Sequence, residues 1–441
     1  MKKVTVDFEK YVGKIKPLHG INNAPIYYTS KNLYHYLKDA GIPFSRMHDT
    51  GGSYGANRYV DIGNVFRDFD ADPEDPNSYD FAFTDWLFEQ ITAEGTEIFF
   101  RLGTSIEGSP QIRAYRIFPP KDNLKWAKIC EGIIKHYNYG WANGYHYNIR
   151  YWEIWNEPDN SEAIEPNCMW QGTKEQFFKF YEVASNYLKN KFPEIKIGGY
   201  GSCGFYALFP KTGGKAAGAN ALRYEYFIEF MHEFFKYITS EEHKSPLDFF
   251  SWHSYDGNAE NNVKYAKYVE EQLNAYGLTE TESILDEWNP STKLRGTELD
   301  ASAIAQMMCA LHPTTVSMMT YYDGQVLNHF CGLFNSMTRD ICPGYYGMHA
   351  YNELYVLGNV VSHVSDEDFP ILAATDGELG KILIPNTTGT DVALDLELLN
   401  GWEVTAFRAL DGINGLLNVE FDAGQLVVPK DKLVLVECKR K

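Results

Sequence analysis

Most of the chain alternates between two hydrophobic patterns. Short, nearly continuous apolar runs are typical of strands buried on both faces, and longer stretches with apolar residues every three or four positions are typical of amphipathic helices. Eight strand-like runs lie at 17–21, 42–48, 96–103, 149–155, 195–201, 247–255, 282–288 and 314–322. Helix-like stretches lie at 32–41, 83–95, 124–137, 175–190, 222–238, 262–277, 301–312 and 345–358. Eight such β/α units predict an α/β fold, a (β/α)8 TIM barrel of parallel strands with covering helices.

The pattern changes beyond residue 360. Short runs of alternating apolar and polar residues, separated by Gly, Asn and Asp, lie at 381–388, 391–399, 402–410, 415–422, 425–429 and 432–438. Such runs predict an antiparallel β-domain. Residues 2–8 alternate in the same way and are expected to add a strand to it. The prediction is a barrel domain over 16–358 and an accessory β-sandwich domain built from 1–15 and 359–441.

The bulk composition fits this division and excludes some partners. A chain of 441 residues exceeds the size at which one hydrophobic core usually stops growing, and 44% hydrophobic residues suffice to fill two cores. With 40 Lys and Arg against 59 Asp and Glu, the formal charge of -19 repels nucleic acid and anionic membrane surfaces, so we expect neither as a partner. Aromatic residues reach 15%, which is common where flat faces stack on sugar rings; a Tyr-rich surface without special purpose is the alternative.

The seven cysteines are scattered and never form a C-x-x-C pair, so we expect reduced core residues rather than disulfides or a zinc site. The opening MKKVTVDFEK has no apolar signal-peptide segment, and no apolar run approaches the roughly 18 residues of a membrane-spanning helix. These features predict a cytoplasmic protein. Nothing in the sequence predicts a cofactor, and a homo-oligomer stays open.

The first candidate for chemistry is Glu157, in the stretch YWEIWNEPDN. It follows the predicted fourth strand, and Pro158 stops further strand pairing, so a fixed carboxyl that reaches solvent is expected there. Asn156 beside it can hydrogen-bond a substrate hydroxyl. Because the C-terminal strand ends of a TIM barrel converge on one face, Glu157 is expected at the open end of the barrel.

A second acidic position lies on the seventh strand, in SILDEWN. Alternation sends Asp286 and Glu287 to opposite sides, so only one is expected to point into the barrel mouth, and alternation alone does not choose between them. Trp288 would supply a wall for sugar stacking, which favours its neighbour Glu287. Two carboxylates in one aromatic cleft suit glycoside hydrolysis, in which one protonates the leaving oxygen and the other attacks the anomeric carbon. The alternative is that either acid pairs with an Arg at the barrel rim.

The motifs WNEP at 155–158 and DEWN at 286–289 resemble the retaining TIM-barrel glycosidases. In detail the chain resembles glycoside hydrolase family 39, the β-xylosidase and α-iduronidase family. That family carries an Arg-x-His at the end of the second strand, matched by Arg46 and His48. It also carries a His-x-Tyr after the sixth strand, matched here in SWHSY.

The resemblance implies Glu287 as the nucleophile and Glu157 as the general acid/base. Tyr255 is then expected to hold Glu287 in its attacking rotamer, and Arg46 to depress the pKa of Glu287. His48 is expected to meet sugar hydroxyls, with a satisfied rim histidine as the alternative. The predicted substrate-binding residues are Arg46, His48, Asn156, His253, Tyr255, Trp288, Tyr322 and Asp323, and no metal ligand is predicted.

The sequence departs from the β-xylosidase pattern after the eighth strand. Those enzymes place a pair of acids there to hold sugar hydroxyls, whereas TYYDGQ offers Tyr321, Tyr322 and the single Asp323. The specificity for xylose is therefore open.

An acidic stretch from Asp49 to Asp80 follows the second strand, and its alternating aspartates at 68, 70 and 72 resemble a calcium loop. An EF-hand, however, needs Gly where Pro73 stands and Glu where Tyr79 stands. We expect a solvated loop on the active-site face that walls off one end of the cleft, with calcium binding as the alternative.

Together these observations predict a retaining exo-glycosidase, β-xylosidase-like, that acts on a neutral plant-type glycan or oligosaccharide by double displacement. The same machinery on another sugar, as an arabinosidase, glucosidase or galactosidase, is the first alternative. A catalytically weak carbohydrate-binding barrel is the second, although a binding protein has no need of two acids in one cleft. The acidic stretch and the net charge of -19 disfavour uronic acids as substrates.

Overall fold

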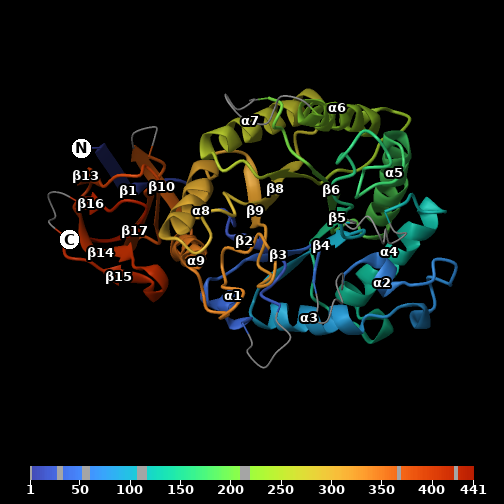
Figure 1. Cartoon of the computed structure of the whole chain (residues 1–441), viewed down its shortest axis with the longest axis horizontal. Coiled ribbons are helices and arrows are strands. Elements are labelled where there is room, and N and C mark those ends of the chain that lie inside the picture. Colours follow the sequence, from blue (N-terminus) through green and yellow to red (C-terminus); the bar gives the residue numbers. More distant parts are fainter. Residues whose placement is uncertain are drawn as a thin grey trace.

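The computed structural model describes residues 2–26, 33–51, 60–106, 117–208, 219–364, 369–421 and 426–441. Two sheets organise it (Figure 1). One is a closed barrel with the strand order β2-β3-β4-β5-β6-β7-β8-β9, and the other is a nine-stranded sheet that contains strands from both ends of the chain. The predicted fold class is confirmed.

The barrel strands run parallel, and β2 closes the ring by pairing with both β3 and β9. All eight predicted strands are confirmed. Their bounds are β2 Gly20–Asn22, β3 Phe44–Met47, β4 Glu97–Leu102, β5 Tyr151–Ile154, β6 Lys196–Ser202, β7 Phe249–Ser254, β8 Glu282–Trp288 and β9 Val316–Tyr321.

Helices cover the outside of the barrel (Figure 1). The eight predicted helices are confirmed over the described residues, as α1 His35–Asp39, α3 Ala82–Ala93, α4 Asn123–Tyr139, α5 Lys174–Lys191, α6 Ala219–Thr239, α7 Ala259–Ala275, α8 Glu298–Leu311 and α9 Pro343–Tyr355. A one-turn helix, α2 Ile62–Val65, precedes α3 and was not predicted. Local sequence sets the ends: α4 starts after Asp122, whose side chain accepts a hydrogen bond from the Lys125 N–H, and stops at Gly140 with a φ of 73°.

The second sheet has the strand order β15-β14-β17-β12-β11-β10-β1-β13-β16. Its bounds are β1 Lys2–Lys14, β10 Asn359–Val364, β11 Leu372–Thr375, β12 Leu379–Pro385, β13 Val392–Leu398, β14 Trp402–Leu410, β15 Leu416–Asn418, β16 Leu426–Val428 and β17 Leu433–Arg440. β1 pairs antiparallel with β10 and parallel with β13, so the first residues lie inside the C-terminal sheet, as predicted. The sheet curls around its own apolar core, which includes Val6, Ile382 and Val436.

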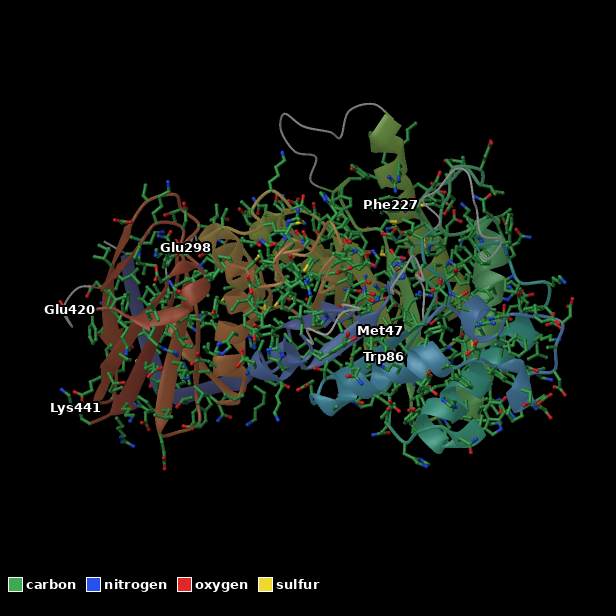
Figure 2. The ribbon with its side chains drawn as sticks, turned by 60° about the horizontal axis from the view of Figure 1, so that its bottom comes forward. Met47, Trp86, Phe227, Glu298, Glu420 and Lys441 are labelled. Carbon is green, nitrogen blue, oxygen red and sulfur yellow. The ribbon has the colours of Figure 1, made fainter. Side chains whose placement is uncertain are left out.

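The barrel interior is filled toward the N-terminal ends of the strands. Six apolar side chains pack together there, namely Phe44, Phe99, Tyr151, Phe249, Ile284 and Met318. The opposite, C-terminal end therefore holds the polar groups, as in other filled barrels. Figure 2 shows Met47, the last residue of β3, among the barrel strands, and Glu298, at the start of α8, beside the second sheet.

The cysteines lie mostly in the core, as predicted. All seven cysteines are free of disulfide bonds, and six of them are buried while Cys168 is partly exposed. Among the described residues, no helix combines the length and the apolar composition needed to cross a membrane. The predicted division at 15/16 and 358/359 stays a prediction, although the two sheets separate their strands at those points.

Candidate active site

Glu157 lies just beyond β5, where the backbone is forced into an uncommon conformation. Trp155 has a φ of 73° and Glu157 has a φ of 46°, values that residues other than glycine rarely adopt. The Glu157 N–H donates to the carbonyl oxygens of Tyr200 and Gly201 on β6, at 3.2 and 3.0 Å, which holds this turn in place. The carboxyl is therefore fixed at the open end of the barrel.

On β8, both Asp286 and Glu287 contact the same guanidinium, which alternation did not predict. Arg46 on β3 has its Nε 2.8 Å from Asp286 Oδ2 and its Nη1 2.8 Å from Glu287 Oε1. The prediction that only one acid points inward is wrong, because the pairing of β8 shifts register against both neighbours, between Leu285 and Trp288. An irregularity of this kind turns consecutive side chains to one side of a strand.

Arg46 is wholly buried and its donors are engaged by partners on three strands. Nε donates to Glu153 Oε2 at 2.8 Å, Nη1 to Asn22 Oδ1 at 3.0 Å, and Nη2 to Asn156 Oδ1 at 2.6 Å. Burial alone raises the pKa of Glu153, but the Arg46 charge and the hydrogen bonds leave the pKa below its usual range. Burial raises the pKa of Asp286 well above its usual range, with the Glu153 charge raising it as well and the Arg46 and His253 charges opposing.

Tyr255 and His253 distinguish the two glutamates. The Tyr255 hydroxyl donates to Glu287 Oε2 at 2.8 Å, whereas His253 Nδ1 lies 2.8 Å from Glu157 Oε1 and 3.4 Å from Glu287 Oε2. His253 Nε2 lies 3.5 Å from Asp286 Oδ1. Burial lowers the pKa of His253, but the charges of Glu287, Asp286 and Glu157 outweigh it and raise the pKa to about 9. His253 is thus an imidazolium at neutral pH.

Glu157 has two direct partners. Besides His253, the Asn160 side-chain amide donates to Glu157 Oε2 at 2.8 Å. Burial raises the pKa of Glu157, yet the His253 hydrogen bond and charge lower it further than burial raises it. In the free site Glu157 is therefore ionised, with a proton held next to it on His253 Nδ1.

The two glutamates lie close together. One carboxylate oxygen of Glu157, one of Glu287 and one ring nitrogen of His253 all lie within 4.8 Å of one another. Three such groups could in principle hold a metal ion, but a metal ligand must be a neutral imidazole. Here His253 is protonated and Arg46 already balances the charge of Glu287, so the donor set does not fit a metal.

His48 and Tyr322 border the same opening. Arg101 Nε donates to His48 Nδ1 at 3.1 Å, so the proton of the neutral ring sits on Nε2, 3.7 Å from Glu287 Oε1. Burial lowers the pKa of His48 well below its usual range, and the Arg101 charge lowers it further. The Tyr322 hydroxyl donates to Asp49 Oδ2 at 3.1 Å. Neither Asp49 nor Arg101 was among the predicted site residues.

Trp288 and Asp323 do not reach the opening. Trp288 has no exposed surface and packs in the apolar core against Tyr321, with ring centroids 5.4 Å apart, so it cannot form the expected stacking wall. Asp323 is also fully buried, and its carboxylate accepts from the Gln325 N–H and from Asn328 Nδ2, each at 2.6 Å. Burial raises the pKa of Asp323 to about 8.

The sequence missed several groups that hold the site. Asn22, Glu153 and Asn160 were not singled out, although Glu153 is an acid in the middle of a buried strand and Asn160 lies one turn after Glu157. An acid inside a predicted buried strand is a signal for a buried partner of opposite charge. Asp286 was weighed but not chosen.

The acidic stretch is described at residues 49–51 and 60–80, and residues 52–59 lie outside the described part. Asp68 and Asp72 each accept a hydrogen bond from the backbone N–H two residues later, and Asp70 pairs with Lys121 at 3.0 Å on the surface. Among the described residues these carboxylates are not part of a group that could hold a metal.

A closed β/α barrel that brings two carboxylates from different strands together at its open end is the arrangement of a glycoside hydrolase. The chain belongs to glycosyl hydrolases family 39, whose model matches residues 10–311. The resemblance noted from the motifs is thereby confirmed.

The individual relatives share at most a quarter of their residues with this chain over the matched parts. A β-xylosidase of Geobacillus stearothermophilus is 25% identical over 221 residues, which span 48% of this chain and only 37% of that enzyme. A glucosidase from Croceicoccus marinus matches 100% of this chain and 99% of its own, with a TM-score of 0.79 and 19% identity. A monomeric β-xylosidase from Caulobacter crescentus matches 100% of both chains, with a TM-score of 0.66 and 16% identity. These two likenesses show the fold.

Proposed function

We propose that the chain is a retaining exo-glycosidase for neutral sugars, with Glu287 as the nucleophile and Glu157 as the general acid/base. One observation carries this proposal. Oxygens of the two carboxylates approach within 4.8 Å, and the two groups have different partners. Retaining enzymes keep their carboxyl groups about 5–5.5 Å apart, whereas inverting enzymes leave room for a water at about 6.5–9.5 Å.

Glu287 has the environment of a nucleophile. The Arg46 guanidinium and the Tyr255 hydroxyl each donate to one of its oxygens, which fixes the rotamer. A free lone pair on Glu287 can then attack the anomeric carbon as the bond to the leaving oxygen breaks. The product of this step is a glycosyl-enzyme ester.

Glu157 supplies the proton for the leaving oxygen. Because Glu157 is ionised in the free site, the proton first passes from His253 Nδ1 to Glu157 Oε1, over the 2.8 Å contact, and then to the leaving group. In the second step the Glu157 carboxylate removes a proton from water, and the resulting hydroxide displaces Glu287 from the sugar. That proton then returns from Glu157 Oε1 to His253 Nδ1, which restores the free site for the next cycle.

The kind of sugar is inferred from the relatives of the chain. Relatives are described as β-xylosidases and as a glucosidase, so a pentoside or hexoside without charge is the substrate class we propose. An arabinoside or galactoside would use the same groups. Exo action is proposed because the stretch between Asp49 and Asp80 follows β3 and adds bulk on the face that carries the site.

Substitution of the two glutamates tests the assignment. Glu157→Ala is expected to retain much of its glycosylation rate on an aryl glycoside with a good leaving group, because that group leaves without a proton, and added azide restores turnover. Glu287→Ala is expected to lose activity on every substrate. NMR of the first-formed product should show the anomeric configuration of the substrate.

Other outcomes point to other functions. Inversion of configuration contradicts Glu287 as the nucleophile, and equal losses in both variants without azide rescue contradict the separate roles. Absence of hydrolysis by the wild type on a panel of nitrophenyl pentosides and hexosides, with sugar binding retained, favours the carbohydrate-binding alternative. Early release of long fragments from a polysaccharide contradicts exo action.

A further inference from the structure

Asp49 is an acid at the site opening that the sequence did not single out. It directly follows His48 beyond β3 and has a φ of 51°, an uncommon backbone conformation that tends to occur at functional positions. Its side chain is 17% exposed, whereas the Asp323 side chain is fully buried. Asp49 is thus the aspartate that retains open surface beside Glu287.

The carboxylate of Asp49 lies within a ring of site groups. Oδ2 accepts from the Tyr322 hydroxyl at 3.1 Å and lies 3.5 Å from His48 Nε2, which in turn lies 3.7 Å from Glu287 Oε1. The ring closes through Tyr255, which donates to Glu287 and whose ring centroid lies 6.2 Å from that of Tyr322. A sugar held with its anomeric carbon at Glu287 would therefore bring its ring hydroxyls toward Asp49.

Asp49 is held in position by a residue from the segment that follows β9, the last strand of the barrel. Gln325, which follows β9, donates from Nε2 to the Asp49 carbonyl oxygen at 3.0 Å and to Asp323 Oδ2 at 3.1 Å. Asp49 Oδ1 accepts from the Ile106 N–H at 2.8 Å. Asp323, expected to bind sugar, instead acts through Gln325 as a positioning residue for Asp49.

We infer that Asp49 is a specificity-determining residue of the glycone pocket, where its carboxylate accepts hydrogen bonds from sugar hydroxyls and repels the carboxylate of a uronic acid. This inference rests on the proposed function, since it assumes a sugar held at Glu287. Among the described residues, each Asp49 oxygen accepts one hydrogen bond from the protein, which leaves a second lone pair for a sugar hydroxyl.

The surrounding charges support selection of a neutral sugar. Glu287 and Glu157 face the pocket, and Asp61 lies behind Asp49. The nearby guanidinium groups are engaged: Arg46 by four partners, and Arg101 by His48 and by Asp61 at 2.7 Å. His253 is held by Glu157. In the part of the chain that the structure describes, Arg46, Arg101 and His253 therefore each already have a carboxylate partner.

Burial raises the pKa of Asp49 to about 6, with the Glu287 charge raising it as well and the Ile106 N–H and Arg101 opposing. Asp49 is therefore ionised at pH 7 and gains a proton as pH falls through 6. Since the ionised form accepts hydroxyls best, KM for a neutral glycoside should rise below that pH.

Asp49→Asn tests the inference because it keeps the shape and removes the charge. We expect KM for the preferred neutral glycoside to rise about 10- to 100-fold with a smaller change in kcat, since a buried polar contact is lost. The rise of KM below pH 6 should disappear, and the kcat/KM ratio of neutral glycoside to uronide should fall at least about tenfold. Asp72→Asn, at an exposed carboxylate, removes the same charge and should leave all three quantities unchanged.

The failure of this inference is separable from that of the proposed function. If the wild type hydrolyses neutral glycosides but Asp49→Asn keeps the KM and the selectivity, the inference is overturned and the function stands. If Asp72→Asn changes KM and the selectivity as much as Asp49→Asn does, the net charge of the protein explains both effects. That result also overturns the inference. If Asp49→Asn does not fold, the wild-type KM between pH 5 and 7 decides alone, and a flat profile contradicts the inference. A wild type without neutral glycosidase activity overturns the proposed function.

Discussion

At the scale of single residues, the positive charge of one histidine balances much of the negative charge of the site. His253 lies within 3.5 Å of carboxylate oxygens from Glu157, Glu287 and Asp286, and it has no exposed surface. Removing this charge leaves buried carboxylates without their partner, which is among the more costly changes in a protein interior.

The pH dependence of stability should report this charge. The folded pKa of His253, about 9, is above the ordinary value of 6.5, so its contribution to the free energy of unfolding is complete below pH 6.5 and is lost as pH rises through 9. The full contribution corresponds to roughly 3 kcal/mol. We expect His253→Gln to be less stable than the wild type at pH 6.5, with the difference shrinking toward pH 9.5 in urea unfolding.

His146→Gln is the matched control, because this histidine is exposed on the surface. Its unfolding midpoint should follow the wild type at each pH. A constant gap between His253→Gln and the wild type from pH 6.5 to 9.5 would mean that packing, and not charge, explains the loss.

The positions of the site residues could be predicted from the sequence where they depend only on the ends of the strands and on the spacing of the motifs. Glu157, Glu287 and Tyr255 lie where the motifs placed them, because parallel strand ends converge. Trp288 could not be predicted, since the register shift in β8 sets which side chains point inward. Asp49 could not either, because its contacts come from the segment after β9, more than 270 residues later in the chain.

At the scale of elements, the end of β6 is shaped by glycines. Gly201 has a φ of +66°, and a Cβ there would lie 3.0 Å from Asn156 Oδ1, 3.1 Å from His253 Nε2 and 3.4 Å from Arg46 Nη2. The close approach of β6 to these groups therefore depends on the missing side chain.

Gly201→Ala should therefore impair both stability and activity. The positive φ alone costs an alanine about 1–2 kcal/mol, and the crowding displaces the groups that hold both glutamates. We expect kcat to fall at least about tenfold, because small displacements of positioned groups are costly in catalysis. Differential scanning calorimetry and steady-state kinetics measure the two effects.

Gly277→Ala separates the two causes. Gly277 has a φ of +75° with nothing within 4 Å of the added Cβ, so only backbone strain applies. It should lose about 1–2 kcal/mol of stability and keep its kcat. Similar kinetics in the two variants would contradict the role given to the β6 end.

Most elements were predicted, including short strands such as β2 and β16 that have three residues each, whereas α2, β10 and β11 were missed. The eight barrel strands and their helices each bury a continuous apolar face, which the sequence displays directly. β11 has four residues and α2 also has four, too few to show a period. β10 was missed although it pairs with β1, because that pairing joins the two ends of the chain and carries no local signal.

At the scale of the whole molecule, α8 and α9 join the barrel to the second sheet. Glu353 on α9 bonds Lys381 of β12 at 2.6 Å and also Arg408 of β14. On α8, Glu298 accepts from the Gly412 N–H at 2.8 Å. The sheet is therefore held to the barrel by polar contacts as well as by apolar packing.

Glu353→Gln should weaken this connection without changing the chemistry of the site. Burial raises the pKa of Glu353, but the bonds from Arg408 and Lys381 outweigh it and leave the pKa below its ordinary value. The contribution to stability is therefore present above the ordinary pKa of glutamate and is lost as pH falls through the lower folded value. At pH 7 we expect a loss of about 1–3 kcal/mol in the free energy of unfolding, with kcat/KM retained below the melting transition.

The exposed pair of Glu229 with Lys174, at 3.0 Å, supplies the control, and Glu229→Gln should cost less than about 1 kcal/mol. Calorimetry at pH 7 and pH 4 decides the matter: a loss for Glu353→Gln that is equal at both pH values, or no larger than that of the control, would show that these charges do not hold the second sheet to the barrel.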